Sequence, residues 1–124
     1  MTQSHSPKIL RLAADDSLYG RMNDPTGAAF FTGACGDDME FYLVVSGGRI
    51  FEARYYTERG CEVTRACGAT VVKFANGRGL EESLSISAGD VLMELGEVPA
   101  SHRHCAILAV ITFYKAVADV LLKP

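Results

Sequence analysis

A chain of 124 residues, of which 48% are hydrophobic and 22% charged, is long enough for one packed domain and too apolar for a disordered segment. The net charge is −3, and the sequence has no block of like charges, so we expect no nucleic-acid partner. The first residues lack a basic start followed by an apolar run, so we expect no secretory signal, a cytoplasmic location and reduced thiols.

The first half of the chain predicts a short helix followed by a three-stranded meander. Ser6 before Pro7 is typical of a helix start. Alternating residues predict the second and third strands, and in the third they place Phe51, Ala53 and Tyr55 on one face. The Gly47-Gly48 pair suits the tight turn of a hairpin. The expected elements are a helix over residues 7–14 and strands over residues 27–32, 38–45 and 51–56.

The second half predicts helices. An apolar stripe at helical spacing runs from Val63 to Phe74, and the capping box Ser87-x-x-Asp90 opens another helix. Ser101 is expected to cap a last helix, whose apolar residues are interrupted by charges, so we expect a buried helix without membrane contact. The expected helices cover residues 63–75, 80–86, 88–95 and 102–122. The chain is therefore predicted to be a single α+β domain over residues 1–124, with a three-stranded antiparallel sheet packed on helices and a long C-terminal helix.

The cysteines fall into two groups. Cys67 lies inside the apolar stripe and is expected in the core. Cys35, Cys61 and Cys105 each lie at a turn or a helix start, beside a Gly, Asp or His. A helix N-terminus favours a thiolate, so Cys61 and Cys105 are expected to be activated there. Since no C-x-x-C pair occurs, the signature of a structural zinc site is absent from the sequence.

These three thiols predict one metal or iron–sulfur site. Glycines flank Cys35 in Gly33-Ala34-Cys35-Gly36-Asp37 and let the backbone turn sharply, so that sulfur and carboxylate can point at one atom. Asp37 and His104 are candidate further ligands, although Asp37 also suits a plain turn and His104 a backbone contact. Five further carboxylates are interpreted as solvated: Asp38, Glu52, Glu81, Glu82 and Glu94.

The order and spacing of three short motifs resemble the scaffold proteins of iron–sulfur cluster assembly of the IscU/NifU type. The resemblance covers about residue 26 to the C-terminus, whereas residues 1–25 match loosely. The Gly47-Gly48 hairpin and the Leu80-Glu81-Glu82 stretch are also similar. The motifs are Ala34-Cys35-Gly36-Asp37, Arg59-Gly60-Cys61 and His104-Cys105-Ala106-Ile107-Leu108-Ala109.

The resemblance implies a non-enzymatic scaffold that assembles a transient 2Fe–2S cluster. It implies sulfur from a cysteine desulfurase, iron from a donor, and transfer of the cluster to acceptor apo-proteins. The implied ligands are Cys35, Cys61 and Cys105, with Asp37 or His104 as the fourth, and zinc as a second possible occupant. Cys105 is the implied persulfide acceptor. A zinc-binding sulfur relay and a structural zinc domain are the alternative interpretations.

Some features depart from the family pattern and indicate a divergent member. Val98-Pro99-Ala100-Ser101-His102 replaces the usual Leu-Pro-Pro-Val-Lys, which argues against dependence on an Hsp70-type chaperone. The last helix has only a narrow polar stripe. We therefore expect Ile111, Tyr114 or Val117 to be partly exposed and to contribute to a partner surface or a homodimer.

Overall fold

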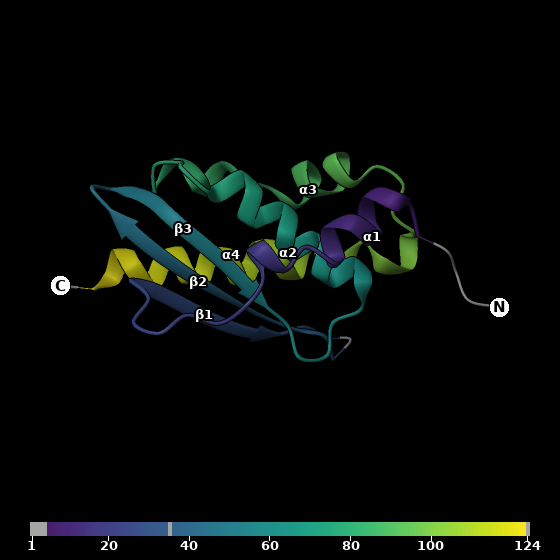
Figure 1. Ribbon diagram of the computed structural model, residues 1–124, viewed down its shortest axis with the longest axis horizontal. Helices are drawn as coiled ribbons and strands as arrows, with labels where there is room; N and C mark the ends of the chain where they lie inside the picture. Colours follow the sequence, from purple (N-terminus) through teal and green to yellow (C-terminus); the bar gives the residue numbers. More distant parts are fainter. Residues whose placement is uncertain (1–4, 35, 124) are drawn as a thin grey trace.

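The computed structural model describes residues 5–34 and 36–123 and has the predicted α+β architecture (Figure 1). The strands form an antiparallel sheet in the order β1-β2-β3. The helices are α1 (Pro7–Ala13), α2 (Glu62–Ala75), α3 (Ala88–Leu95) and α4 (His104–Leu122), and the strands are β1 (Gly27–Thr32), β2 (Asp38–Ser46) and β3 (Arg49–Tyr56). Short 3-10 turns cover Asp16–Leu18, Glu82–Ser85 and Ala100–His102.

The core lies between the sheet and the helices. Helix α4 packs along β1 and β2, helix α2 packs on β3 and on α4, and α1 and α3 both pack against α2 (Figure 1). The predicted alternation places Met39, Phe41 and Leu43 in the interior. The rings of Phe41 and Phe113 meet edge to face with centroids 5.7 Å apart, which joins the sheet to α4.

The prediction that Phe51 shares one face of the strand with Ala53 and Tyr55 is wrong. A β-bulge between Val44 and Val45 shifts the register of the β2–β3 pairing, so Val45 faces Ile50. Ile50 is consequently buried, and Phe51 is 76% exposed. Beyond the bulge the alternation holds, and Ala53 and Tyr55 face the core.

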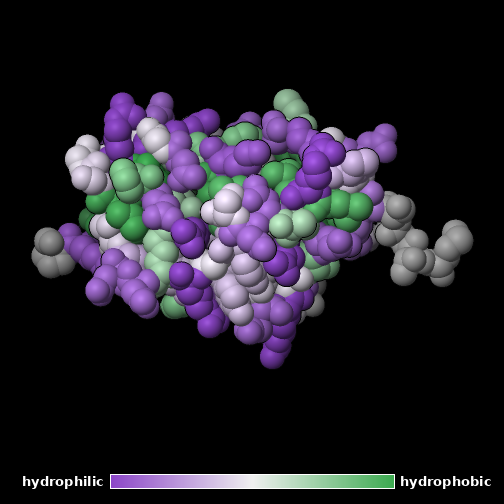
Figure 2. Space-filling view, viewed as in Figure 1, coloured by the Kyte–Doolittle hydropathy of each residue, from purple (hydrophilic) through white to green (hydrophobic). Residues whose placement is uncertain are grey.

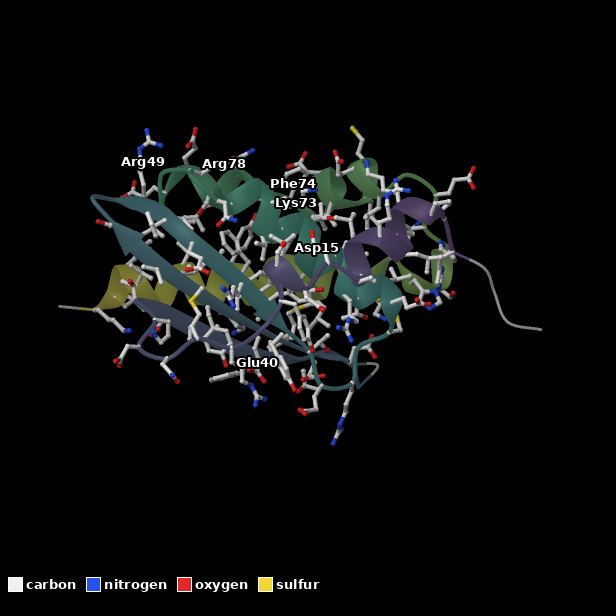
Figure 3. The ribbon with its side chains drawn as sticks, viewed as in Figure 1. Asp15, Glu40, Arg49, Lys73, Phe74 and Arg78 are labelled. Atoms are coloured by element: carbon white, nitrogen blue, oxygen red, sulfur yellow. The ribbon has the colours of Figure 1, made fainter. Side chains whose placement is uncertain are left out.

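The opposite face of the sheet carries a polar network. Glu40, labelled in Figure 3, accepts two hydrogen bonds from the Arg21 guanidinium, at 3.0 and 3.1 Å, and one from the Tyr42 hydroxyl. The guanidinium also lies over the Tyr56 ring, 4.1 Å from its centroid. Hydrophilic side chains predominate on the molecular face in Figure 2, with apolar side chains showing between them.

The long C-terminal helix begins later than predicted. The 3-10 turn Ala100–His102 comes first, and α4 starts at His104 with Arg103 at its N-cap, so Ser101 is not the cap. The segment Ala100–Leu122 is the one stretch of the described chain long and apolar enough to span a membrane. Half of its most apolar window is buried inside the fold, and packing on β1, β2 and α2 accounts for that composition.

The predicted exposure on α4 is correct for two of its three residues. Ile111 is 36% exposed, and Tyr114 is half-buried, with its hydroxyl donating to the carbonyl of Ile86. Val117 is fully buried and belongs to the hydrophobic core. Ile107, one turn before Ile111, is also exposed. Self-association through this side stays a prediction.

Candidate metal centre

Two connections and the start of one helix, which are far apart in the sequence, meet at one end of the sheet. The β1–β2 connection brings Asp37, the β3–α2 connection brings Cys61, and the first turn of α4 brings His104 and Cys105. The first two connections lie side by side at the lower right of Figure 1. Cys35 belongs to the same motif as Asp37 but lies outside the described residues.

The side chains of Asp37, His104 and Cys105 point at one another. One potential ligand atom from each lies within 4.8 Å of the other two. The Cys105 Sγ is 4.0 Å from the Asp37 Oδ2 and 3.8 Å from the His104 Nε2. Sulfur, nitrogen and oxygen donors at this separation suit zinc, and thiolates suit iron–sulfur clusters. Both Asp37 and His104 lie beside the thiol, so each is within reach of a metal ion bound at that sulfur.

Cys61 joins this group through a residue that sequence reasoning missed. Cys61 is the N-cap of α2 and is half-buried. Its Sγ lies 3.4 Å from the hydroxyl oxygen of Thr64, and the same oxygen lies 3.3 Å from the Sγ of Cys105. The two thiols therefore share one hydroxyl. Thr64 follows Cys61 by one helical turn, a spacing that is visible in the sequence, but nothing there shows that Cys105 lies opposite.

The expected activation of Cys105 by its helix start is wrong. Its side chain is fully buried, and this burial raises the pKa of the thiol to about 12. The Thr64 hydrogen bond opposes that shift, while the neighbouring Cys61 and Asp37 add to it. Desolvation outweighs the helix dipole here. A thiol of this kind becomes a ligand when a metal ion displaces its proton.

Cys67 lies in the core, as predicted. It is fully buried among apolar side chains of α2 and its neighbours, and burial raises the pKa of its thiol. A protonated thiol in such surroundings behaves as a small apolar group.

Comparison with protein families fits this arrangement. The sequence model described as NifU-like N terminal domain matches residues 5–124. The chain belongs to this family. This NifU-like chain is 30% identical over 120 residues to the iron-sulfur cluster assembly scaffold protein IscU 1 of Archaeoglobus fulgidus, a match that covers 96% of this chain and 78% of that protein. It is 34% identical over 86 residues to the iron-sulfur cluster assembly scaffold protein IscU of Escherichia coli K12, a match that covers 69% of this chain and 66% of that protein.

A further relative is much longer. The bifunctional protein NifU/MnmA of Rubrobacter xylanophilus is 28% identical over 121 residues, and the match covers 96% of this NifU-like chain but 25% of that protein.

Solved structures share the fold of this NifU-like chain. A putative iron-sulfur cluster assembly scaffold for the SUF system from Fervidobacterium islandicum AW-1 superimposes with a TM-score of 0.76, and the match covers 91% of this chain and 96% of that one. The N-terminal part of a NifU-like protein from Brucella abortus superimposes with a TM-score of 0.74, and the match covers 96% of this chain and 95% of that one. Both are 14% identical in sequence, so the likeness concerns the fold.

A clamp between two connections holds the NifU-like site together, and it includes Asp38, which we expected to be solvated. The Asp38 carboxylate accepts hydrogen bonds from the backbone amides of Arg59, at 2.7 Å, and Glu58, at 3.1 Å. The Thr57 hydroxyl donates to the Asp38 carbonyl at 2.6 Å and accepts from the Gly60 amide at 2.8 Å. Asp38 thus fixes the loop before Cys61 against the loop of Asp37. Two adjacent acidic residues give no sign of this in the sequence.

Asp38→Asn is expected to lower the free energy of unfolding by about 1 kcal/mol at pH 7, less than is usual for hydrogen bonds to a charged group because the side chain is partly exposed. Burial raises the pKa of Asp38, but the bonds from Arg59, Glu58 and Thr57 outweigh it and hold that pKa below its usual value. Such a group stabilises the fold above its unfolded pKa of about 3.9, and the contribution disappears as pH falls through the lower folded pKa.

Urea unfolding at neutral pH and at a pH of about 3 measures this contribution. The difference between Asp38→Asn and the parent should shrink at the lower pH, and Glu97→Gln, at an exposed carboxylate, should show little effect at either. An equal loss at both pH values would contradict the role of the charge.

Proposed function

We propose that this chain is a scaffold on which a 2Fe–2S cluster is assembled before it passes to acceptor proteins. The observation that carries the proposal is the convergence of Cys61, Cys105, Asp37 and His104 at one end of a NifU-like fold. Cys35 belongs to the proposed ligand set through its motif. We also propose a cytoplasmic location, because such a site requires reduced thiols.

The proposed ligands suit a cargo that must leave again. Cys61 and Cys105 would supply thiolates, the soft ligands that iron–sulfur clusters need. Asp37 or His104 would supply a harder and weaker donor. Because one weak ligand beside strong ones leaves a cluster easier to release, the mixed set favours a carrier over a permanent cofactor site.

The surroundings of Cys105 indicate how sulfur could arrive. We propose a cysteine desulfurase as the sulfur source, a separate iron donor, and Cys105 as the persulfide acceptor. After losing its proton, the Cys105 sulfur would attack the outer sulfur of the desulfurase persulfide and release the desulfurase cysteine as a thiolate. Cys105 itself is buried, but His104 beside it is exposed. A cavity of about 300 Å³ opens there, lined by Phe31, Ala34, His104, Ile107 and neighbouring residues. This cavity is the approach that we assign to the incoming sulfur.

Anaerobic reconstitution tests the proposal. The protein is incubated with ferrous iron, a cysteine desulfurase, cysteine and a thiol reductant, and then mixed with an apo-ferredoxin of the 2Fe–2S class. We expect visible charge-transfer bands on the scaffold and their transfer to the ferredoxin, with slower transfer from Asp37→Ala. Protein that stays colourless and retains zinc would contradict the scaffold function. A desulfurase rate that then rises in its presence would favour the sulfur relay.

A further inference from the structure

The Thr64 hydroxyl occupies the centre of the candidate site. Thr64 is fully buried, and its Oγ1 lies 2.7 Å from the Asp37 Oδ2, 3.3 Å from the Cys105 Sγ and 3.4 Å from the Cys61 Sγ. Its three partners come from three different segments of the fold: the β1–β2 connection, the β3–α2 connection and the first turn of α4. One oxygen therefore touches a side chain from each segment that builds the site.

This geometry differs from that of other buried threonines in the helices. Thr70 in α2 and Thr112 in α4 each donate to the carbonyl one turn earlier, at 2.8 and 2.7 Å. Such a bond to the helix backbone is the common arrangement for a threonine inside a helix. The Thr64 hydroxyl lies instead against three side chains, of which Asp37 and Cys105 come from other segments of the fold.

The Thr64 hydroxyl can donate only one hydrogen bond at a time, so its three contacts cannot all be donated by it. A threonine hydroxyl has one proton to donate and two lone pairs that accept. The short contact to a carboxylate makes Asp37 the favoured acceptor of that proton. With the proton on this bond, the Cys61 thiol can donate to the Thr64 oxygen. Rotation about the C–O bond also lets the hydroxyl donate to the Cys105 sulfur.

The glycine of the Arg59-Gly60-Cys61 motif allows Thr64 to approach. A Cβ at Gly60 would lie 2.6 Å from the Thr64 Cγ2 and 2.5 Å from the Thr57 Oγ1, closer than real side chains pack. The backbone at Gly60 thus lies directly against the Thr64 methyl group. Because a β-branched side chain has few rotamers in a helix, this packing holds the hydroxyl in its direction.

We infer that Thr64 is a positioning residue for the metal or cluster ligands, a role that rests on the proposed function of the site. Its hydroxyl holds the Asp37 carboxylate and the Cys105 sulfur at a fixed separation from Cys61. Groups that orient ligands in this way typically contribute about 10- to 100-fold to metal affinity. Thr64 therefore holds the ligand atoms in position for a metal ion or cluster without being a ligand itself.

Zinc affinity, measured by competition with a chromophoric chelator, tests this role. Thr64→Val keeps the shape but removes the hydroxyl, and is expected to weaken zinc binding at least about tenfold. Thr64→Ser keeps the hydroxyl and should bind zinc like the parent. Thr112→Val makes the same change at an equally buried site away from the ligands and should also bind like the parent. Circular dichroism melting shows whether each variant is folded.

A double variant distinguishes positioning from a general effect on the fold. If Thr64 acts through Asp37, Thr64→Val should cost much less zinc affinity in the Asp37→Ala background than in the parent. Two results would overturn the inference. One is that Thr64→Val lowers zinc affinity as much in the Asp37→Ala background as in the parent, and the other is that folded Thr64→Val binds zinc like the parent. A Cys105→Ala protein that still binds zinc like the parent would contradict the proposed function instead, so the two failures are distinguishable.

Discussion

Cys105→Ala is expected to reduce zinc affinity by at least about 100-fold and to prevent cluster formation in the reconstitution assay. The Cys105 sulfur is the atom that Asp37, His104 and Thr64 all approach, at distances of 4.0, 3.8 and 3.3 Å. Removing it leaves the harder donors without the soft ligand between them. Chelator competition for zinc and visible absorption after reconstitution measure the two effects.

Cys67→Ala is the matched control, because both cysteines are fully buried in helices and both changes remove one sulfur from the interior. Each variant should lose about 1 kcal/mol of stability from the small cavity. Only Cys105→Ala should lose metal, since Cys67 lies in the apolar core. Equal zinc affinity in the two variants would show that Cys105 is not a ligand.

The fold was predictable wherever a pattern repeats along the chain. Alternation revealed β2 and β3 and helical spacing revealed α2, whereas a capping box revealed the start of α3. The predictions were wrong where one bulge or one short turn interrupts the regular pattern. The bulge at Val44 and Val45 exposes Phe51, and the turn before Arg103 delays the start of α4. A bulge changes which face a side chain takes without changing the composition of the strand, so the sequence carries little sign of it.

The site was predictable only as a set of residue types. The motifs around Cys61 and Cys105 identified these two cysteines as candidate ligands. In the fold, both sulfurs lie against the Thr64 hydroxyl. Thr64 and Asp38 were missed because their roles depend on contacts between segments that are 20 or more residues apart. A buried threonine and an acidic turn residue look ordinary until their partners are known.

Gly68→Ala is expected to lower the free energy of unfolding by about 3 kcal/mol, as strong overpacking of a buried site does. The sign is opposite to that of helix propensity, because alanine is normally better than glycine inside a helix by about 1 kcal/mol. Here the helix backbone lies directly against a buried ring. A Cβ at Gly68 would lie 2.5 Å from the Cδ2 and 2.7 Å from the Cγ of Tyr55.

Tyr55 has no room to move away from that methyl group. Its ring is fully buried in the core and packs edge to face on Tyr19, with centroids 5.0 Å apart. Gly89→Ala is the control, because a Cβ there meets only the Ser87 hydroxyl oxygen at an ordinary 3.6 Å. Urea unfolding should show Gly89→Ala as stable as the parent or more stable by about 0.5 kcal/mol. If Gly68→Ala behaved in the same way, β3 and α2 would not be packed backbone against ring, and the support that α2 gives to Cys61 and Thr64 would have to come from elsewhere.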